Sequence, residues 1–246
     1  MHRYQILIEY VGTNFIGWQI QSKGKSIQKI IQIKISKLLK ERIALVGSGR
    51  TDTGVHAIEQ SAHFDCKKKI ENLDKFLNSV NYFLNIKLIT IKNIKNRDLN
   101  FHARFSAKER IYRYIIFNRN STPSIEKERG WHIKKRLDIK LMKKGAQKLL
   151  GTNDFSVFRS SKCNAKNATR TMKSIKIKKI KDKIEVQFKS QSFLRQQVRS
   201  MMGCLKYLAE KKWDLKKFET VFKSKKRILC APPAPAHGLF LEKVIY

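Results

Sequence analysis

The sequence has few of the features that mark secreted, membrane or metal-binding proteins. Its four cysteines, at positions 66, 163, 204 and 230, are far apart and form no Cys-x-x-Cys pair. Because zinc sites and disulfide frameworks usually show close spacing, we expect reduced thiols and no metal site. No apolar run approaches the roughly 20 residues of a membrane span, and the N-terminal residues lack the apolar core of a signal peptide. We therefore expect a cytoplasmic protein with no membrane partner.

Acidic residues are also scarce. Only 19 Asp and Glu residues oppose 54 Lys and Arg residues, which gives a net charge of +35. Such a charge predicts a polyanionic partner, because each phosphate that a cation neutralises releases counterions. The hydrophobic content of 41% indicates a folded protein rather than a disordered basic tail. The abundance of Lys together with Ile and Asn also fits a biased coding composition, so the charge predicts nucleic acid binding without specifying any chemistry.

The chain of 246 residues is long enough for one large domain or two small ones. Strand and helix patterns recur in a similar order about half the chain apart, which predicts two α+β subdomains, 1–105 and 106–246. In the first, apolar alternation predicts strands at 4–11, 43–47, 59–66 and 86–94, and helical periodicity predicts helices at 26–41 and 72–84.

The second subdomain has the same mixture of elements. We expect strands at 110–118, 171–180, 183–190 and 237–246, helices at 138–151, 193–209 and 214–222, and an exposed basic loop at 118–130. Short hairpins and crossovers suggest sheets covered by helices on one face. The predicted fold is α+β, with two similar subdomains whose mostly antiparallel sheets join across a central cleft, with helices on the outer face.

One carboxylate stands out in the stretch "GSGRTDTGVHA", residues 47–57. Asp52 follows Arg50 by two residues and is the only acid between Glu41 and Glu59. The local interpretation is a turn, since Asp and Gly both favour turns. Metal-dependent nucleases need several converging carboxylates to hold their ions, and this sequence supplies no such cluster. The sequence also has no Gly-x-x-x-x-Gly-Lys-Ser/Thr loop, so we expect no nucleotide-driven chemistry. A single Asp can still act as a nucleophile or a base when a neighbouring guanidinium keeps it ionised.

Two further sets of residues have both a structural and a functional interpretation. Arg195 and Arg199 are one helical turn apart and would share a helix face, which alone fits an ordinary solvated basic surface. Tyr112 and Tyr114 lie on one face of a predicted strand, where aromatic residues usually pack in the core. In a basic cleft, however, an exposed aromatic ring is what an unstacked base packs against.

Residues 49–57, "GRTDTGVHA", resemble the signature of the tRNA pseudouridine synthases of the TruA type, whose usual form is Gly-Arg-Thr-Asp-Ala-Gly-Val-His. Four more segments resemble the family in the same order: 101–118, 149–159, 192–203 and 237–246. The resemblance therefore spans nearly the whole chain. It implies an enzyme that isomerises uridine to pseudouridine in the anticodon arm of tRNA, at positions 38, 39 and 40. It also implies that no cofactor is used and that the enzyme is a homodimer.

The resemblance assigns a role to five positions of this sequence. Asp52 matches the catalytic aspartate, and Arg50 an arginine that helps to hold the extruded nucleotide. Tyr112 matches the tyrosine that stacks on the uracil, and Arg199 matches the arginine that pairs with the catalytic carboxylate. Leu239 matches a leucine that lines the base pocket. The sequence does not choose between attack on the sugar C1′, attack on the base C6 and abstraction of a sugar proton.

The chain departs from the family pattern at four positions. Thr53 replaces the usual small residue after the aspartate, Arg195 and Gln196 stand where a pair of histidines is expected, and Ser200 stands where asparagine is expected. None of these changes removes a catalytic group. The alternatives are a non-catalytic RNA-binding or RNA-chaperone protein that retains the fold, and a metal-dependent nuclease, whose carboxylate ligands the sequence does not supply.

Overall fold

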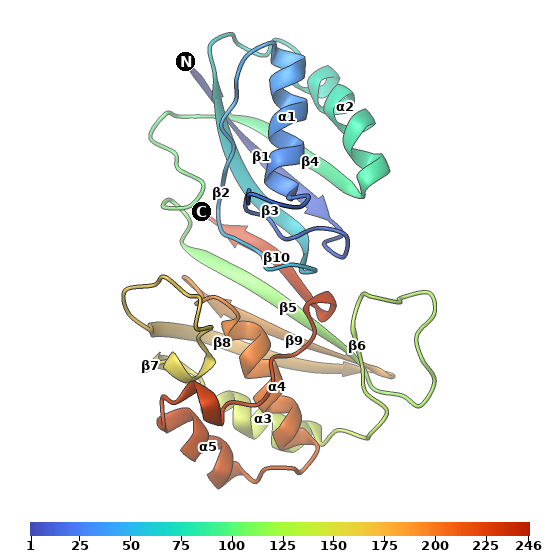
Figure 1. The fold of residues 1–246 in the computed structure, drawn as a ribbon, viewed down its shortest axis with the longest axis vertical. Helices are drawn as coiled ribbons and strands as arrows, with labels where there is room; N and C mark the ends of the chain where they lie inside the picture. Colours follow the sequence, from blue (N-terminus) through green and yellow to red (C-terminus); the bar gives the residue numbers. More distant parts are fainter. The chain divides into compact units, whose positions relative to one another are not determined.

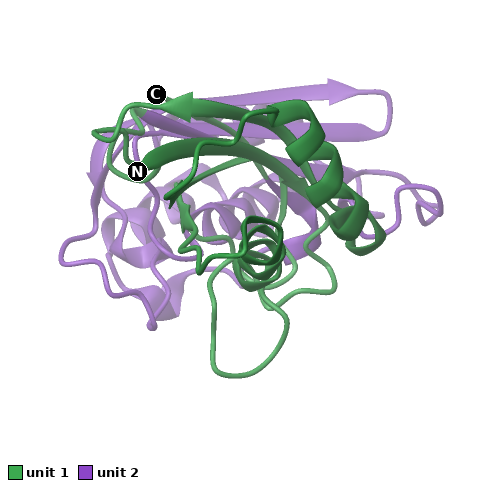
Figure 2. Ribbon diagram, turned by 90° about the horizontal axis from the view of Figure 1, so that it is seen from above, with its two compact units in different colours: residues 1–108, 241–246 green, residues 109–240 purple.

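The computed structural model describes residues 1–246, which form two compact units (Figure 2). Unit 1 comprises residues 1–108 and 241–246, and unit 2 comprises residues 109–240. The C-terminal residues therefore group with the first part of the chain, although the sequence places them in the second predicted subdomain. In each unit the strands form one layer and the helices another (Figures 1 and 2).

The sheet of unit 1 has the strand order β4 (Ile89–Arg97), β1 (His2–Tyr10), β3 (His56–Cys66) and β10 (Leu239–Ile245), of which residues 241–245 belong to this unit. The short β2 (Val46–Gly47) pairs with β3, and β1 is antiparallel to both β3 and β4. The helices are α1 (Ile27–Leu39) and α2 (Leu73–Leu84), which the 3-10 helix η1 (Asn85–Lys87) follows.

Side-chain periodicity explains these elements. Ile27, Ile31 and Ile35 form the buried stripe of α1, and alternate residues of β1, such as Ile6 and Ile8, are fully buried. Burying each such side chain stabilises the fold by about 1.5–3 kcal/mol. Both helices begin where the sequence predicts, because a polar side chain caps each N-terminus: the Ser26 hydroxyl accepts from the Lys29 N–H, and the Asn72 amide oxygen from the Lys75 N–H.

The sheet of unit 2 has the order β5 (Glu109–Phe117), β9 (Lys183–Ser190), β8 (Thr169–Ile180) and β7 (Gly151–Asp154). These strands are antiparallel, and β6 (Trp131–His132) adds a parallel pair beside β5. The helices are α3 (Ile139–Gln147), α4 (Gln197–Ala209) and α5 (Leu215–Lys223), with 3-10 turns η2 (Ser156–Phe158), η3 (Arg227–Leu229) and η4 (Ala236–Gly238). The predicted α+β class with mostly antiparallel strands is confirmed.

The core of unit 2 lies between β9 and the helices. Alternate residues of β9, among them Val186 and Phe188, are fully buried, as are Leu205 and Leu208 of α4. Gly145 lets α3 approach α4 closely, because a Cβ atom at that position would lie 2.3 Å from the Leu208 side chain. The close helix contact therefore depends on a residue without a side chain.

The helix predicted at 193–209 begins four residues later than expected. Gln196 has a left-handed backbone with φ of 63°, and α4 starts only at Gln197. Arg195 thus lies outside the helix, and the expectation that it shares a helix face with Arg199 is wrong. Instead, the Arg195 guanidinium donates to the Lys162 carbonyl at 3.2 Å. None of the helices has the length and apolar content that a membrane span requires.

Candidate active site

Asp52 lies in the loop between β2 and β3 of unit 1. The Val55 N–H donates to the Asp52 carbonyl oxygen at 3.1 Å and closes a tight turn. Gly54 takes a positive φ of 78° within that turn, a conformation that favours glycine. The Asp52 residue is half-buried and Arg50 is exposed. The turn that Asp52 and its neighbouring glycines predict is therefore present, and it carries the Asp52 carboxylate at a partly accessible position.

A second loop, residues 12–17, packs directly against the Asp52 turn. A Cβ atom on Gly12 would lie 1.9 Å from the Val55 carbonyl oxygen, and one on Gly17 would lie 2.4 Å from the Thr51 carbonyl oxygen. Gly17 also has a positive φ of 101°. Only glycine permits this backbone contact, so the two glycines set the position of the turn. Sequence reasoning missed this support, although both glycines interrupt the region after β1.

Hydrogen bonds fix the residues on either side of Asp52. The Tyr10 and Thr51 hydroxyls are 2.9 Å apart in the core, and the Trp18 N–H donates to the Thr51 carbonyl oxygen at 3.2 Å. Beyond the turn, the Gly12 N–H donates to Nδ1 of His56 at 3.0 Å. Because these contacts hold both ends of the turn, the Asp52 backbone is oriented before any substrate binds, which is what a reacting group requires.

Thr53, which departs from the family pattern, joins the same network. Its hydroxyl donates to the Ile16 carbonyl oxygen at 3.0 Å, and the residue is exposed. The extra hydroxyl therefore makes one more link between the turn and the 12–17 loop.

The start of the Asp52 loop is held by a buried polar pair. The Ser48 hydroxyl donates to Oε1 of Gln60 at 2.6 Å, and Nε2 of Gln60 donates to the Gly49 carbonyl oxygen at 2.9 Å. Ser48 and Gln60 are both buried, so breaking this pair would leave unpartnered polar atoms in the core. Sequence reasoning did not identify either residue.

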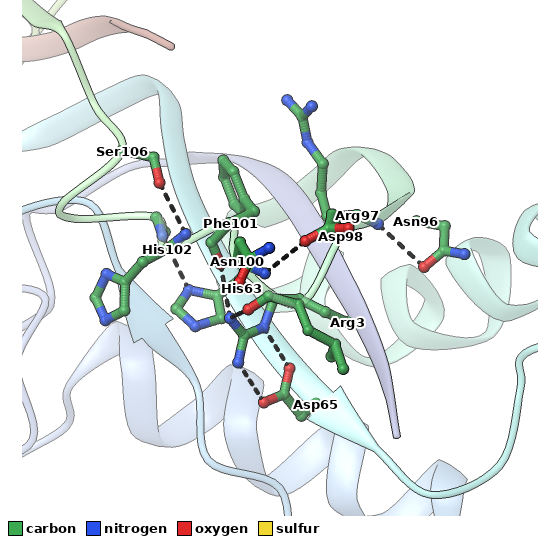
Figure 3. Close-up of polar contacts among 12 residues, drawn as sticks. Arg3, His63, Asp65, Asn96, Arg97, Asp98, Asn100, Phe101, His102 and Ser106 are labelled. Carbon is green, nitrogen blue, oxygen red and sulfur yellow. Dashed lines mark hydrogen bonds and ion pairs between the residues drawn. The ribbon is translucent and has the colours of Figure 1, made fainter.

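The segment 101–107, which begins the second family-like motif, is held by a polar cluster in unit 1 (Figure 3). The Arg3 guanidinium makes two hydrogen bonds of 2.7 Å to the Asp65 carboxylate and one of 2.8 Å to the Phe101 carbonyl oxygen. The bond to Arg3 holds the pKa of Asp65 below its usual value.

His63 belongs to the same cluster. Its Nδ1 accepts from the Ala103 N–H at 3.1 Å, and its ring centroid lies 4.9 Å from that of His102 (Figure 3). Burial is the main reason that the pKa of His63 falls from 6.5 to about 4, and the positive charge of Arg3 adds to it. The imidazole is therefore neutral at neutral pH, as its acceptor role requires.

The other predicted site residues lie in unit 2. Tyr112 on β5 is 9% exposed, and its ring packs edge to face with Phe193 at 5.1 Å. Tyr114, on the same face of the strand, is fully buried and its hydroxyl donates to the Pro235 carbonyl oxygen at 2.8 Å. Burial raises the pKa of the Tyr114 phenol well above its usual value. Tyr114 is thus a core residue, as the structural interpretation of the pair expects.

Arg199 on α4 is paired with Ala234 in both directions. Its Nε donates to the Ala234 carbonyl oxygen at 2.7 Å, and the Ala234 N–H donates to the Arg199 carbonyl oxygen at 2.9 Å. Burial lowers the pKa of His237, and the positive charge of Arg199 contributes to that shift. The guanidinium is therefore oriented by the 231–235 segment and lies close enough to influence the residues before β10.

Leu239, at the start of β10, is 5% exposed. Gly238 precedes it, and a Cβ atom there would lie 2.6 Å from the Tyr114 ring. The structure thus places Arg50 and Asp52 in unit 1, and Tyr112, Arg199 and Leu239 in unit 2.

The acids, thiols and imidazoles of the chain form no group of three or more that could hold a metal ion.

Comparison with known proteins gives matches along the whole chain. A family model described as tRNA pseudouridine synthase matches residues 6–106 and 146–246. The tRNA pseudouridine synthase A of Pelagibacter ubique (strain HTCC1062) is 74% identical over 246 residues, and the alignment covers 100% of both chains. A chain of the solved structure "Crystal Structure of a Cbf5-Nop10-Gar1 Complex" gives a TM-score of only 0.33 at 12% identity over 82% of this chain and 53% of that one, which supports no inference.

More distant relatives carry the same description. The tRNA pseudouridine synthase A of Neorickettsia sennetsu (strain ATCC VR-367 / Miyayama) is 42% identical over 99% of this chain and 100% of its own length. That of Parvibaculum lavamentivorans (strain DS-1 / DSM 13023 / NCIMB 13966) is 37% identical over 100% of both chains. With the Asp52 turn in place and the family matched over both units, the chain belongs to the tRNA pseudouridine synthase family, and within it to the TruA type.

Proposed function

We propose that this chain converts uridine to pseudouridine at positions 38, 39 and 40 in the anticodon arm of tRNA. As a tRNA pseudouridine synthase it is an isomerase. The reaction breaks the bond between the sugar C1′ and N1 of uracil, turns the base and joins C1′ to C5. The proton on C5 is released and N1 takes up a proton, so the product is an isomer of the substrate.

Asp52 is the proposed nucleophile. The observation that carries this assignment is the rigid turn on which Asp52 lies, held by backbone contact with Gly12 and Gly17 and by the hydrogen bond of Thr51 to Tyr10. A carboxylate whose backbone is held by such contacts loses less entropy when it reaches the reacting geometry. The isolated position of this acid in a very basic chain fits a reagent better than a surface charge.

The remaining site residues are proposed to bind the extruded nucleotide. The base must leave the helical stack to be reached, and Arg50, exposed beside the turn, would hold the displaced nucleotide. Tyr112 would stack on the uracil, Leu239 would line the base pocket, and Arg199 would pair with the Asp52 carboxylate. This assignment requires the two sheets to join across a central cleft with the helices on the outer face, an arrangement that we include in the proposal.

The proposed partner is tRNA, and the proposed assembly is a homodimer in the cytoplasm. The net charge of +35 supports a polyanionic substrate. Light scattering of the purified chain would measure its mass and separate a monomer from a dimer.

The activity is tested with unmodified tRNA that carries tritium at C5 of uridine. Isomerisation releases this tritium to water, whereas a non-catalytic RNA-binding protein would release none and a nuclease would shorten the RNA. Pseudouridine-specific chemical modification, followed by primer extension, would then map the product. Tritium release with pseudouridine confined to positions 38, 39 and 40 is the expected result; product elsewhere would contradict the proposed positions, and no release would contradict the activity.

A further inference from the structure

Two cysteines that are distant in the sequence meet in unit 2. Sγ of Cys204, on α4, lies 3.5 Å from Sγ of Cys230, which directly follows the 3-10 turn η3. Cys204 is buried and Cys230 is partly exposed. The turn before Cys230 is at the surface, since Ile228 is 90% exposed and Leu229 is 42% exposed. Cys230 is therefore the member of the pair that is more accessible to a small oxidant from solvent.

The surroundings of the two thiols differ. The hydrogen bond with Cys204 lowers the pKa of Cys230, and the charge of Arg227 adds to this effect. The same hydrogen bond and burial raise the pKa of Cys204. Arg227 is held in place because its Nη1 also donates to the Ser200 hydroxyl at 2.9 Å. Cys230 is therefore the more readily deprotonated thiol of the pair, and deprotonated thiols are the reactive nucleophiles.

We propose that Cys204 and Cys230 form a reversible thiol–disulfide site that peroxide oxidises. The Cys230 thiolate attacks one oxygen of hydrogen peroxide, which breaks the O–O bond, forms a sulfenic acid and releases hydroxide. The Cys204 sulfur then attacks the Cys230 sulfur, forms the S–S bond and expels the sulfenic oxygen as water with the Cys204 proton. In sum, two thiols and one peroxide give one disulfide and two waters, and a dithiol reductant reverses the change.

The pair geometry favours this outcome over other fates of the thiols. The sulfurs need to approach by only about 1.5 Å to reach the S–S bond length of about 2.05 Å. The side chains of Ile228 and Leu229, just before Cys230, are exposed, so a small shift of Cys230 disturbs little packed core at these two positions. Two sulfurs without a third ligand also fall short of the tetrahedral set that a structural zinc site uses.

The site is connected to Arg199 through the segment 230–234, which runs along α4. A Cβ atom on Gly203 would lie 2.1 Å from the Pro232 carbonyl oxygen, and Ala234 makes the two hydrogen bonds with Arg199. Drawing Cys230 toward α4 therefore shifts the segment that orients Arg199. This second part of the inference rests on the proposed function, and it predicts that the disulfide form has a lower rate of isomerisation.

The chemistry is tested on the full chain without any activity measurement. The protein is treated with hydrogen peroxide, free thiols are blocked with N-ethylmaleimide, and the digest is examined by mass spectrometry. We expect a peptide pair linked between Cys204 and Cys230 that dithiothreitol separates. Cys66, whose pKa is raised by burial, serves as the internal control, and Cys230 should react about tenfold faster or more.

Two variants test which thiol reacts with peroxide first and which one then forms the disulfide. Cys204→Ser should stop at the sulfenic acid of Cys230, which dimedone traps, whereas Cys230→Ser should leave Cys204 unmodified. A linkage of either residue to Cys163, or oxidation of Cys66 before Cys230, would overturn the proposal. Activity of the wild type is then compared before oxidation, after it and after reduction. A linked but equally active enzyme would refute only the effect on Arg199, and an enzyme inactive even when reduced would count against the proposed function instead.

Discussion

The buried imidazole of His63 gives the fold a specific sensitivity to acid. The pKa of His63 is about 4 in the folded chain, chiefly because burial disfavours the charged ring, and 6.5 is its ordinary value. Between these two values the unfolded chain binds a proton that the folded chain does not. The free energy of unfolding is therefore unaffected by His63 above pH 6.5 and decreases as the pH falls from 6.5 toward 4.

The size of this effect follows from the two pKa values. A difference of about 2.5 pH units corresponds to about 3 kcal/mol when the transition is complete. Between pH 7 and pH 5 the expected loss from this one residue is about 2 kcal/mol. That is a large fraction of the stability of an ordinary domain, which is about 5–15 kcal/mol.

Urea unfolding at pH 7, 6 and 5, followed by circular dichroism, measures this dependence. The variant His63→Asn retains a hydrogen-bond acceptor for the Ala103 N–H but cannot be protonated in this range, and it should lose about 2 kcal/mol less than the parent between pH 7 and 5. His2→Asn, at the start of β1, is the matched control and should keep the parental dependence. If His63→Asn and the parent lose the same stability, the neutral buried imidazole is refuted.

Three further predictions concern the site residues. Arg199→Lys should lower kcat about 10²-fold with little change in tRNA affinity, because a lysine ammonium cannot both bond the Ala234 carbonyl and orient a carboxylate. Arg195→Lys is the control and should leave kcat unchanged. Rate assays in which the two variants lose the same kcat would contradict this prediction. Tyr112→Ala should weaken substrate binding by about 1–3 kcal/mol, measured as a rise in KM, and Tyr112→Phe should weaken it much less. An Ala variant with an unchanged KM would mean that the ring serves packing alone. Thr53→Ala should lower stability by about 0.5–1 kcal/mol in urea unfolding and leave kcat within about twofold; a tenfold loss of kcat would place the hydroxyl in the chemistry.

Local signals in the sequence predict most of the elements and their starting points. Asp138 caps α3 by accepting from the Leu141 N–H at 2.9 Å, as its position before an amphipathic stretch indicates. The start of α4 could not be predicted in this way, because Gln196 has a left-handed backbone and a residue other than glycine gives no clear sequence signal for that conformation. That single residue decides that Arg195 lies outside the helix.

Contacts between distant segments were the least predictable. Gly12 and Gly17 contact the backbone of the Asp52 turn from about 40 residues earlier in the chain, and the sequence alone does not show which backbone segments are in contact. Cys204 and Cys230 likewise have no close spacing, yet their sulfurs are 3.5 Å apart. Such pairs depend on how the elements pack, since loop closure costs little more for a long separation than for a short one. The proposed identity of the reacting acid, by contrast, comes directly from the sequence motif around Asp52.

The most direct test of the account is the rate at which the Asp52→Ala variant releases tritium from tRNA labelled at C5 of uridine. If Asp52 is the nucleophile, its removal should lower turnover by about 10⁴-fold or more while tRNA binding persists. Glu59→Ala removes the next acid along the chain and is the matched control, which should keep the parental rate. Substantial pseudouridine formation by the folded Asp52→Ala protein would contradict the central claim.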